Sequence, residues 1–160
     1  MGAATANSPV TPDALMAMPD EKSYELAGGQ LVERHMGVFS SWIGGLLCVQ
    51  LGAYCLQAKI GFVWPADNGY TCFPDDPGKV RKPDVSFVRR DRLPSDAGSA
   101  AYLSIAPDLA VEIVSPNDRW STVTGKVDAY LAAGVRLVWV IEPSRRGAGI
   151  AVDFQRMPCA

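Results

Sequence analysis

Residues 109–142 contain the arrangement that most limits how this chain can fold. Two strongly apolar segments, DLAVEIVS and VRLVWVIEP, are typical of strands, and the segment between them, SPNDRWSTVTGKVDAYLAAG, predicts a helix that ends at Gly134. Strand, helix and strand in this order predict a βαβ unit with parallel strands and a right-handed crossover. Both strands are apolar on both faces, as in sheets covered by helices. The sequence therefore predicts an α/β fold with a mixed central β-sheet flanked by helices.

The rest of the chain adds shorter elements to this sheet. YELAGGQLVERH predicts a β-hairpin, GFVWPADNGYTCF a strand, a turn and a strand, and DVSFVRR a further strand. Residues 1–20 are rich in Pro, Ala and Thr and are expected to be a loose lead-in with a short helix over residues 12–18. Because no repeat or linker divides the remainder, residues 21–156 are expected to form a single domain.

Residues 35–58 contain no Lys, Arg, Asp or Glu. A membrane-spanning helix needs about 20 mostly apolar residues, but the glycines, serines and glutamines in this run favour a helix buried in the protein, with no membrane contact. The helix is too apolar to be covered by one layer. A second copy of the chain is therefore expected to bury its other side, which predicts a homodimer.

Charge and cysteine content argue against several other kinds of protein. The net charge of −2 gives no general attraction to nucleic acid, and the basic clusters at residues 79–82, 89–92 and 145–146 are expected to be solvated strand ends and turns. Four cysteines form no Cys-x-x-Cys pair and His35 is the only histidine, so no zinc site is expected. The first residues lack the pattern of a signal peptide, which predicts a reduced, cytoplasmic protein.

A carboxylate interrupts the first apolar strand of the βαβ unit. Side chains alternate across a strand, so Glu112 shares a face with Ala110 and Val114. A lone ionised carboxylate inside a covered sheet is very costly, so Glu112 must be paired, protonated or bound to a metal. An ion pair with an Arg or Lys from elsewhere, or a strand end open to water, is one alternative. The other is that Asp84, which begins a separate strand, lies beside Glu112 and converges with it on one hard cation such as Mg²⁺.

Lys126 is a third candidate for the same site. It follows Glu112 by fourteen residues, in the predicted helix that crosses back over the sheet. Lys126 borders the packing face of this helix, so its stem can run along apolar surface while its ammonium group reaches the carboxylates. An ordinary solvated lysine is the alternative.

These motifs resemble a known family. RKPDVSFVRRDRLP, followed by APDLAVEIVSPNDRWSTVTGKVDAYLAAGVRLVWVIEP, is similar to the Uma-type restriction endonucleases, a bacterial family in the PD-(D/E)XK nuclease superfamily. The resemblance extends from Tyr24 to Phe154 and includes the opening hairpin. It implies a restriction-endonuclease-like core and Mg²⁺-dependent cleavage of phosphodiester bonds, most readily in DNA, with Mn²⁺ as a substitute. Many superfamily members carry the lysine two residues after the glutamate, where this chain has Val114; in the Uma-type pattern it lies on the helix, at Lys126.

The resemblance also implies a role for each site residue. Asp84 and Glu112 would hold the metal together with the backbone carbonyl of Ile113. Lys126 would orient the attacking water or stabilise developing charge, and Glu25 matches an upstream acidic position. The resemblance does not decide whether one metal or two would bind, or whether a C-terminal piece is missing. A different kind of function is also left open: a catalytically idle domain that binds nucleic acid or assembles with other proteins on the same fold.

Overall fold

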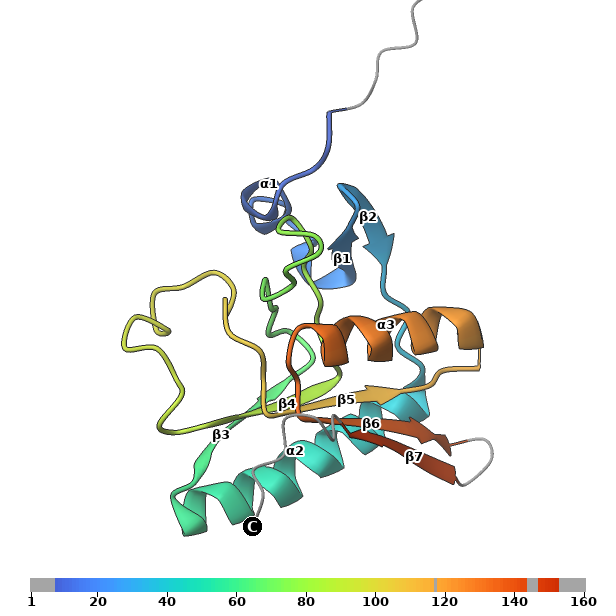
Figure 1. Cartoon of the computed structure of the whole chain (residues 1–160). Coiled ribbons are helices and arrows are strands. Elements are labelled where there is room, and N and C mark those ends of the chain that lie inside the picture. Colours follow the sequence, from blue (N-terminus) through green and yellow to red (C-terminus); the bar gives the residue numbers. More distant parts are fainter. Residues whose placement is uncertain (1–7, 117, 144–146, 153–160) are drawn as a thin grey trace, which may run out of the picture.

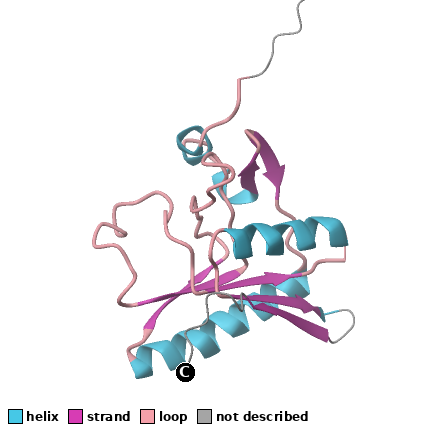
Figure 2. Ribbon diagram, viewed as in Figure 1, coloured by secondary structure: helices cyan, strands magenta, loops and turns pink. Residues whose placement is uncertain are grey.

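A mixed sheet with a long helix on each face forms the centre of the molecule (Figure 1). The computed structural model describes residues 8–116, 118–143 and 147–152. Five strands lie in the order β3 (Gly61–Pro65), β4 (Val85–Arg89), β5 (Leu109–Ile113), β6 (Leu137–Glu142) and β7 (Gly147–Val152). Helix α2 (Val38–Ala58) covers one face and α3 (Trp120–Ala132) the other (Figure 2).

The predicted βαβ unit is confirmed. β5 and β6 pair in parallel, with Glu112 opposite Val140, and α3 connects them. The helix ends at Ala132, and Gly134 follows with φ 92°, a left-handed conformation that suits glycine at a helix end. The other pairs in this sheet are antiparallel. The sheet is therefore mixed, as the sequence predicted.

Alternation along β5 separates two cores. Leu109, Val111 and Ile113 face α2 and pack with Val85. Ala110 faces the other way, into the core that contains Tyr130 of α3. Glu112 shares the face of Ala110, so its carboxylate lies on the α3 side of the sheet.

Asp84 directly precedes β4 and lies beside β5, the strand that carries Glu112. β4 and β5 are antiparallel neighbours with Val85 opposite Val111, and the N–H of Asp84 donates to the carbonyl of Val111 at 2.9 Å. The expectation that the strand after Asp84 lies beside the strand of Glu112 is therefore confirmed.

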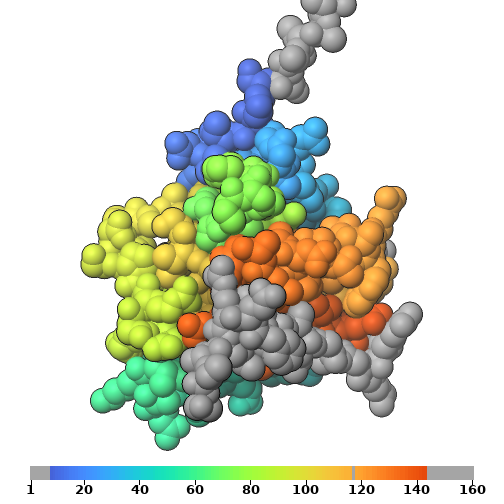
Figure 3. Space-filling model, viewed as in Figure 1, coloured from blue at the N-terminus to red at the C-terminus, as the bar shows by residue number. Residues whose placement is uncertain are grey.

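The predicted N-terminal hairpin forms a small second sheet. β1 (Tyr24–Ala27) and β2 (Gln30–Glu33) are joined by Gly28 and Gly29, whose φ values of 56° and 72° allow the tight turn. A backbone bridge between Leu26 and Val80 holds the hairpin to the rest of the protein. Figure 3 shows the N-terminal segments, the loop that leads to β4, and α3 packed against one another on one face.

A short helix, α1 (Pro12–Met16), occurs where the sequence predicted one, and its Leu15 is buried against Leu26 and Val80. A 3₁₀ turn (Glu21–Ser23) follows it. The limits predicted for the lead-in, residues 1–20, and for the single domain, residues 21–156, stay predictions. The turn predicted at residues 144–146 lies outside the described residues.

Two expectations were wrong in detail. GFVWPADNGYTCF forms only one strand, β3, after which Tyr70 makes isolated bridges to Arg81 and Leu103. The basic cluster at residues 79–82 is not solvated: Lys79 and Lys82 are buried. Each is held by a carboxylate, Lys79 by Asp75 and Lys82 by Glu21. Ion pairing explains how these charges are tolerated away from water.

Helix α2 is covered by its own chain on one side only; the sequence predicted a buried helix, with a second copy of the chain on its other side. Its inner side packs on the sheet through Ile43, Leu47, Cys48 and Leu51. On its outer side, Trp42, Val49 and Leu56 are 61%, 66% and 70% exposed. By length and composition alone α2 could also cross a membrane, but its inner side is occupied by the sheet.

We expect the outer side of α2 to pair with the same side of a second copy. Trp42, Leu46, Val49 and Leu56 follow the three- and four-residue spacing of a helix–helix seam. These four side chains are 42–70% exposed, and a row of exposed large apolar side chains on one helix face is typical of an interaction surface.

Sedimentation velocity at tens of micromolar should therefore show a dimer, and Val49→Glu should convert it to a monomer with an unchanged circular dichroism spectrum. Met16→Glu, an exposed methionine outside α2, is the matched control and should leave the dimer intact. A clean monomer of the unmodified chain would contradict the dimer. Co-sedimentation of that monomer with lipid vesicles would instead assign the helix face to a membrane surface.

Candidate active site

The predicted catalytic side chains Glu25, Asp84, Glu112 and Lys126 line one cavity of about 290 Å³, together with Ile113. Glu25 lies on β1, Asp84 directly precedes β4, Glu112 lies on β5 and Lys126 on α3. The fold thus brings together all five residues that the sequence and the family resemblance singled out.

Lys126 lies between two buried carboxylates. Its Nζ is 3.0 Å from Oε2 of Glu112 and 3.3 Å from Oε1 of Glu25, and its side chain is 16% exposed. Burial acts to lower the pKa of Lys126, but the two carboxylates outweigh it and raise that pKa above its ordinary value. Lys126 is therefore a charged, buried residue that links Glu25 to Glu112, and not a solvated helix lysine.

Glu112 is held at both oxygens. Oε1 accepts a hydrogen bond from the Tyr130 hydroxyl at 2.7 Å, and Oε2 accepts one from Lys126. Burial raises the pKa of Glu112 to about 7; the negative charges of Asp84 and Glu25 add to this, and Lys126 offsets part of it. The ion pair considered from the sequence is present, and the carboxyl nevertheless titrates near neutral pH.

The raised pKa of Glu112 predicts a pH-dependent stability. Its ordinary value is 4.5 and its folded value about 7, so the folded protein binds this proton more tightly. The stability from this group is fully present below about pH 4.5 and is lost as the pH rises through 7. Because Gln does not titrate, the stability of Glu112→Gln should not fall in this way. The difference in unfolding free energy between the variant and the wild type should therefore change by at most about 3.5 kcal/mol over that range. Urea melts at several pH values measure it, and a pH-independent difference would contradict the shift.

Asp84 is fixed to the end of β5. Its Oδ2 accepts the N–H of Ile113 at 2.7 Å, and its Oδ1 lies 3.4 Å from Nη2 of Arg34. Burial raises the pKa of Asp84, while the Ile113 hydrogen bond acts in the opposite direction. The structure places the backbone of Ile113 beside Asp84; metal binding by the Ile113 carbonyl stays a prediction.

Three residues of the site were not predicted from the sequence: Arg34, Arg81 and Tyr130. Nη1 of Arg81 lies 2.9 Å from Oε2 of Glu25, whose Oε1 accepts the backbone N–H of Lys82 at 2.9 Å. Burial acts to raise the pKa of Glu25, but Lys126 and Arg81 outweigh it and hold that pKa below its ordinary value. The sequence signal for Tyr130 was its position four residues after Lys126, which places a phenol near the same strand carboxylate.

The oxygen donors of the cavity fit a divalent cation. Asp84 and Glu112 are hard ligands, and Mg²⁺ typically takes one or two carboxylates together with waters and substrate oxygens. Within residues 8–116, 118–143 and 147–152 there is no cluster of three or more His, Cys, Asp or Glu residues able to hold a metal, so water and substrate would complete the coordination. Burial raises the pKa of both carboxyls, and a cation would favour their ionised forms.

Comparisons with known proteins bear on the family and the fold of the chain. A family model described as Uma2, putative restriction endonuclease, matches residues 12–150. No curated protein matches the chain. Among solved structures, a putative nuclease belonging to DUF820 from Anabaena variabilis superposes with a TM-score of 0.76 at 24% identity, covering 92% of this chain and 82% of that one. This likeness shows a shared fold.

Proposed function

Since the chain belongs to the Uma2 restriction endonuclease family, we propose that it is a metal-dependent nuclease that hydrolyses phosphodiester bonds in DNA. The observation that carries the proposal is the convergence of Glu25, Asp84, Glu112 and Lys126 on one cavity. We also propose that it works in the cytoplasm, where its thiols stay reduced.

Asp84 and Glu112 would hold Mg²⁺ or Mn²⁺. When bound, such a cation polarises the scissile phosphate and lowers the pKa of a coordinated water. The protein contributes fixed positions for both ligands, because Ile113 donates to Asp84 and Tyr130 donates to Glu112. Ligands held in this way need little rearrangement when the cation binds.

Lys126 would orient the attacking water or stabilise charge on the phosphoryl oxygens. Because its pKa is raised, its ammonium acts as a hydrogen-bond donor and a positive charge, not as a general base at neutral pH. Glu25 is a positioning residue: its Oε1 contacts Lys126 while Arg81 and Lys82 hold it in the ionised form.

One observation favours the idle alternative. Three carboxylates at the site face three cations, Arg34, Arg81 and Lys126, so the formal charges balance without a metal. Such a cluster could stabilise the fold alone. Binding of Mg²⁺ that depends on Asp84 separates the two functions.

The direct test is incubation with supercoiled plasmid and Mg²⁺ or Mn²⁺. We expect nicked and linear DNA, no products with excess chelator, and none from Asp84→Asn purified in the same way, which controls for a contaminating nuclease. Absence of cleavage with either metal, on DNA and on RNA, together with no metal binding, would establish the idle domain instead.

A further inference from the structure

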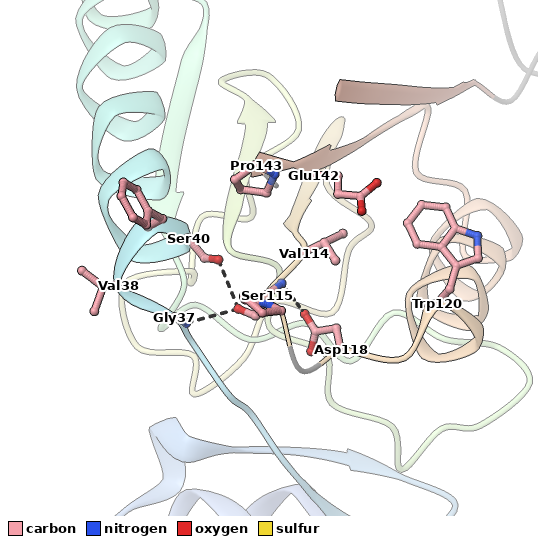
Figure 4. Close-up of a pocket in the computed structure, with 11 residues that line it drawn as sticks. Gly37, Val38, Ser40, Val114, Ser115, Asp118, Trp120, Glu142 and Pro143 are labelled. Atoms are coloured by element: carbon pink, nitrogen blue, oxygen red, sulfur yellow. Dashed lines mark hydrogen bonds between the residues drawn. The ribbon is translucent and has the colours of Figure 1, made fainter. Parts of the chain in front are cut away.

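A second cavity of about 660 Å³ lies next to the candidate active site (Figure 4). Val114, Ser115 and Pro116 line it where β5 ends, and the first turns of α2 and α3 and the end of β6 form its walls. Ser115 and Asp118 line both cavities, so the two adjoin. The carboxylate chemistry proposed above does not use this space.

The lining of this cavity presents an aromatic ring and apolar side chains. Trp120, 58% exposed, stands on the α3 side, and Val38 and Phe39 stand on the α2 side. The described lining residues include the carboxylates of Asp118 and Glu142 but no Lys, Arg or His.

Hydrogen bonds around Ser115 fix the wall between the two cavities in place. Its hydroxyl accepts the N–H of Gly37 at 3.1 Å and lies 3.1 Å from Oγ of Ser40 (Figure 4). Its own N–H donates to Oδ2 of Asp118 at 2.7 Å. These bonds join the end of β5, the start of α2 and the approach to α3, so the cavity exists before any ligand binds.

Resting on the nuclease function, we propose that this cavity binds one unpaired nucleobase of the substrate strand, beside the phosphate that is cleaved. A volume of 660 Å³ lies within the range of about 300–1,000 Å³ typical of small-molecule sites. Trp120 supplies a stacking surface that accepts any base. Because a base enters such a pocket only outside a duplex, the substrate is single-stranded or locally unpaired nucleic acid.

The test compares labelled oligonucleotides of one length, single-stranded and fully paired, by fluorescence anisotropy in chelator so that no cleavage occurs. We expect Trp120→Ala to weaken single-strand binding about 5- to 150-fold, Trp120→Phe to keep most of it, and duplex binding to change less than about 2-fold. Tyr54→Ala removes a similarly exposed aromatic ring that does not line the cavity; as the matched control it should change neither.

Equal weakening of both substrates, unchanged single-strand binding by a folded Trp120→Ala, or no binding by the wild type would each overturn the cavity proposal. Cleavage of the same oligonucleotides with Mg²⁺ is measured in parallel. Cleavage without any dependence on Trp120 would leave the nuclease and remove the base pocket. Trp120-dependent binding without cleavage would leave the pocket and remove the nuclease.

Discussion

Glu112→Gln is expected to lower the rate of DNA cleavage about 100-fold or more while leaving the metal-free protein as stable as wild type or more stable. Gln keeps the shape but removes a buried negative charge that Asp84 and Glu25 repel. Lys126 keeps a partner, because Glu25 lies 3.3 Å away. Mg²⁺ should raise the melting temperature of the wild type by mass action and fail to do so for the variant.

The measurements are initial rates on plasmid and thermal melts of both proteins with and without Mg²⁺. Asp128→Asn is the control, since Asp128 is exposed on the helix that carries Lys126 and lines neither cavity. If Glu112→Gln is clearly destabilised and the wild type shows no response to Mg²⁺, Glu112 is a structural residue and the metal site is wrong.

Lys126→Met should reduce the free energy of unfolding by about 3–5 kcal/mol at neutral pH. Met fills the space of the lysine stem, so the main change is that Glu25 and Glu112 lose the cation between them. The loss should shrink in acid, where protonation removes the carboxylate charges. Urea unfolding followed by circular dichroism gives the difference.

Lys22→Met provides the comparison. Lys22 also forms a lysine–carboxylate pair, with Asp67 at 2.9 Å, but both side chains are exposed. Its loss should leave the free energy of unfolding nearly unchanged, because water and salt screen an exposed pair. Equal, small effects of the two substitutions would mean that Lys126 contributes no more than a surface pair.

Much of the sheet and the centre of the site followed from local patterns. Two apolar segments with a helix-length segment and Gly134 between them specified the βαβ unit, because period and length distinguish strands from helices. Glu112 stood out because a charge is costly within an apolar strand. The pairing of Asp84 with Glu112 needed one further assumption, that their strands are neighbours, and the parts played by Lys126 and Glu25 came mainly from the family resemblance.

The remainder depends on packing that no local pattern encodes. Arg34 and Arg81 reach the site because the hairpin is bridged to the segment before β4, through Leu26 and Val80. Lys82 is buried with Glu21, distant in sequence, against it. Likewise, α2 is apolar around its circumference, so its sequence does not say which side the sheet covers. Its exposure became visible only with the sheet in place.

The site residues are spread widely along the sequence. A single cut in the chain can therefore separate them. The exposed loop around residues 95–100 lies between Asp84 and Glu112 in sequence. A cut there would leave Glu25 and Asp84 on one fragment and Glu112 and Lys126 on the other, so neither fragment would hold a complete set of groups. If the proposed cleavage needs all four groups, it would require the two fragments to reassociate.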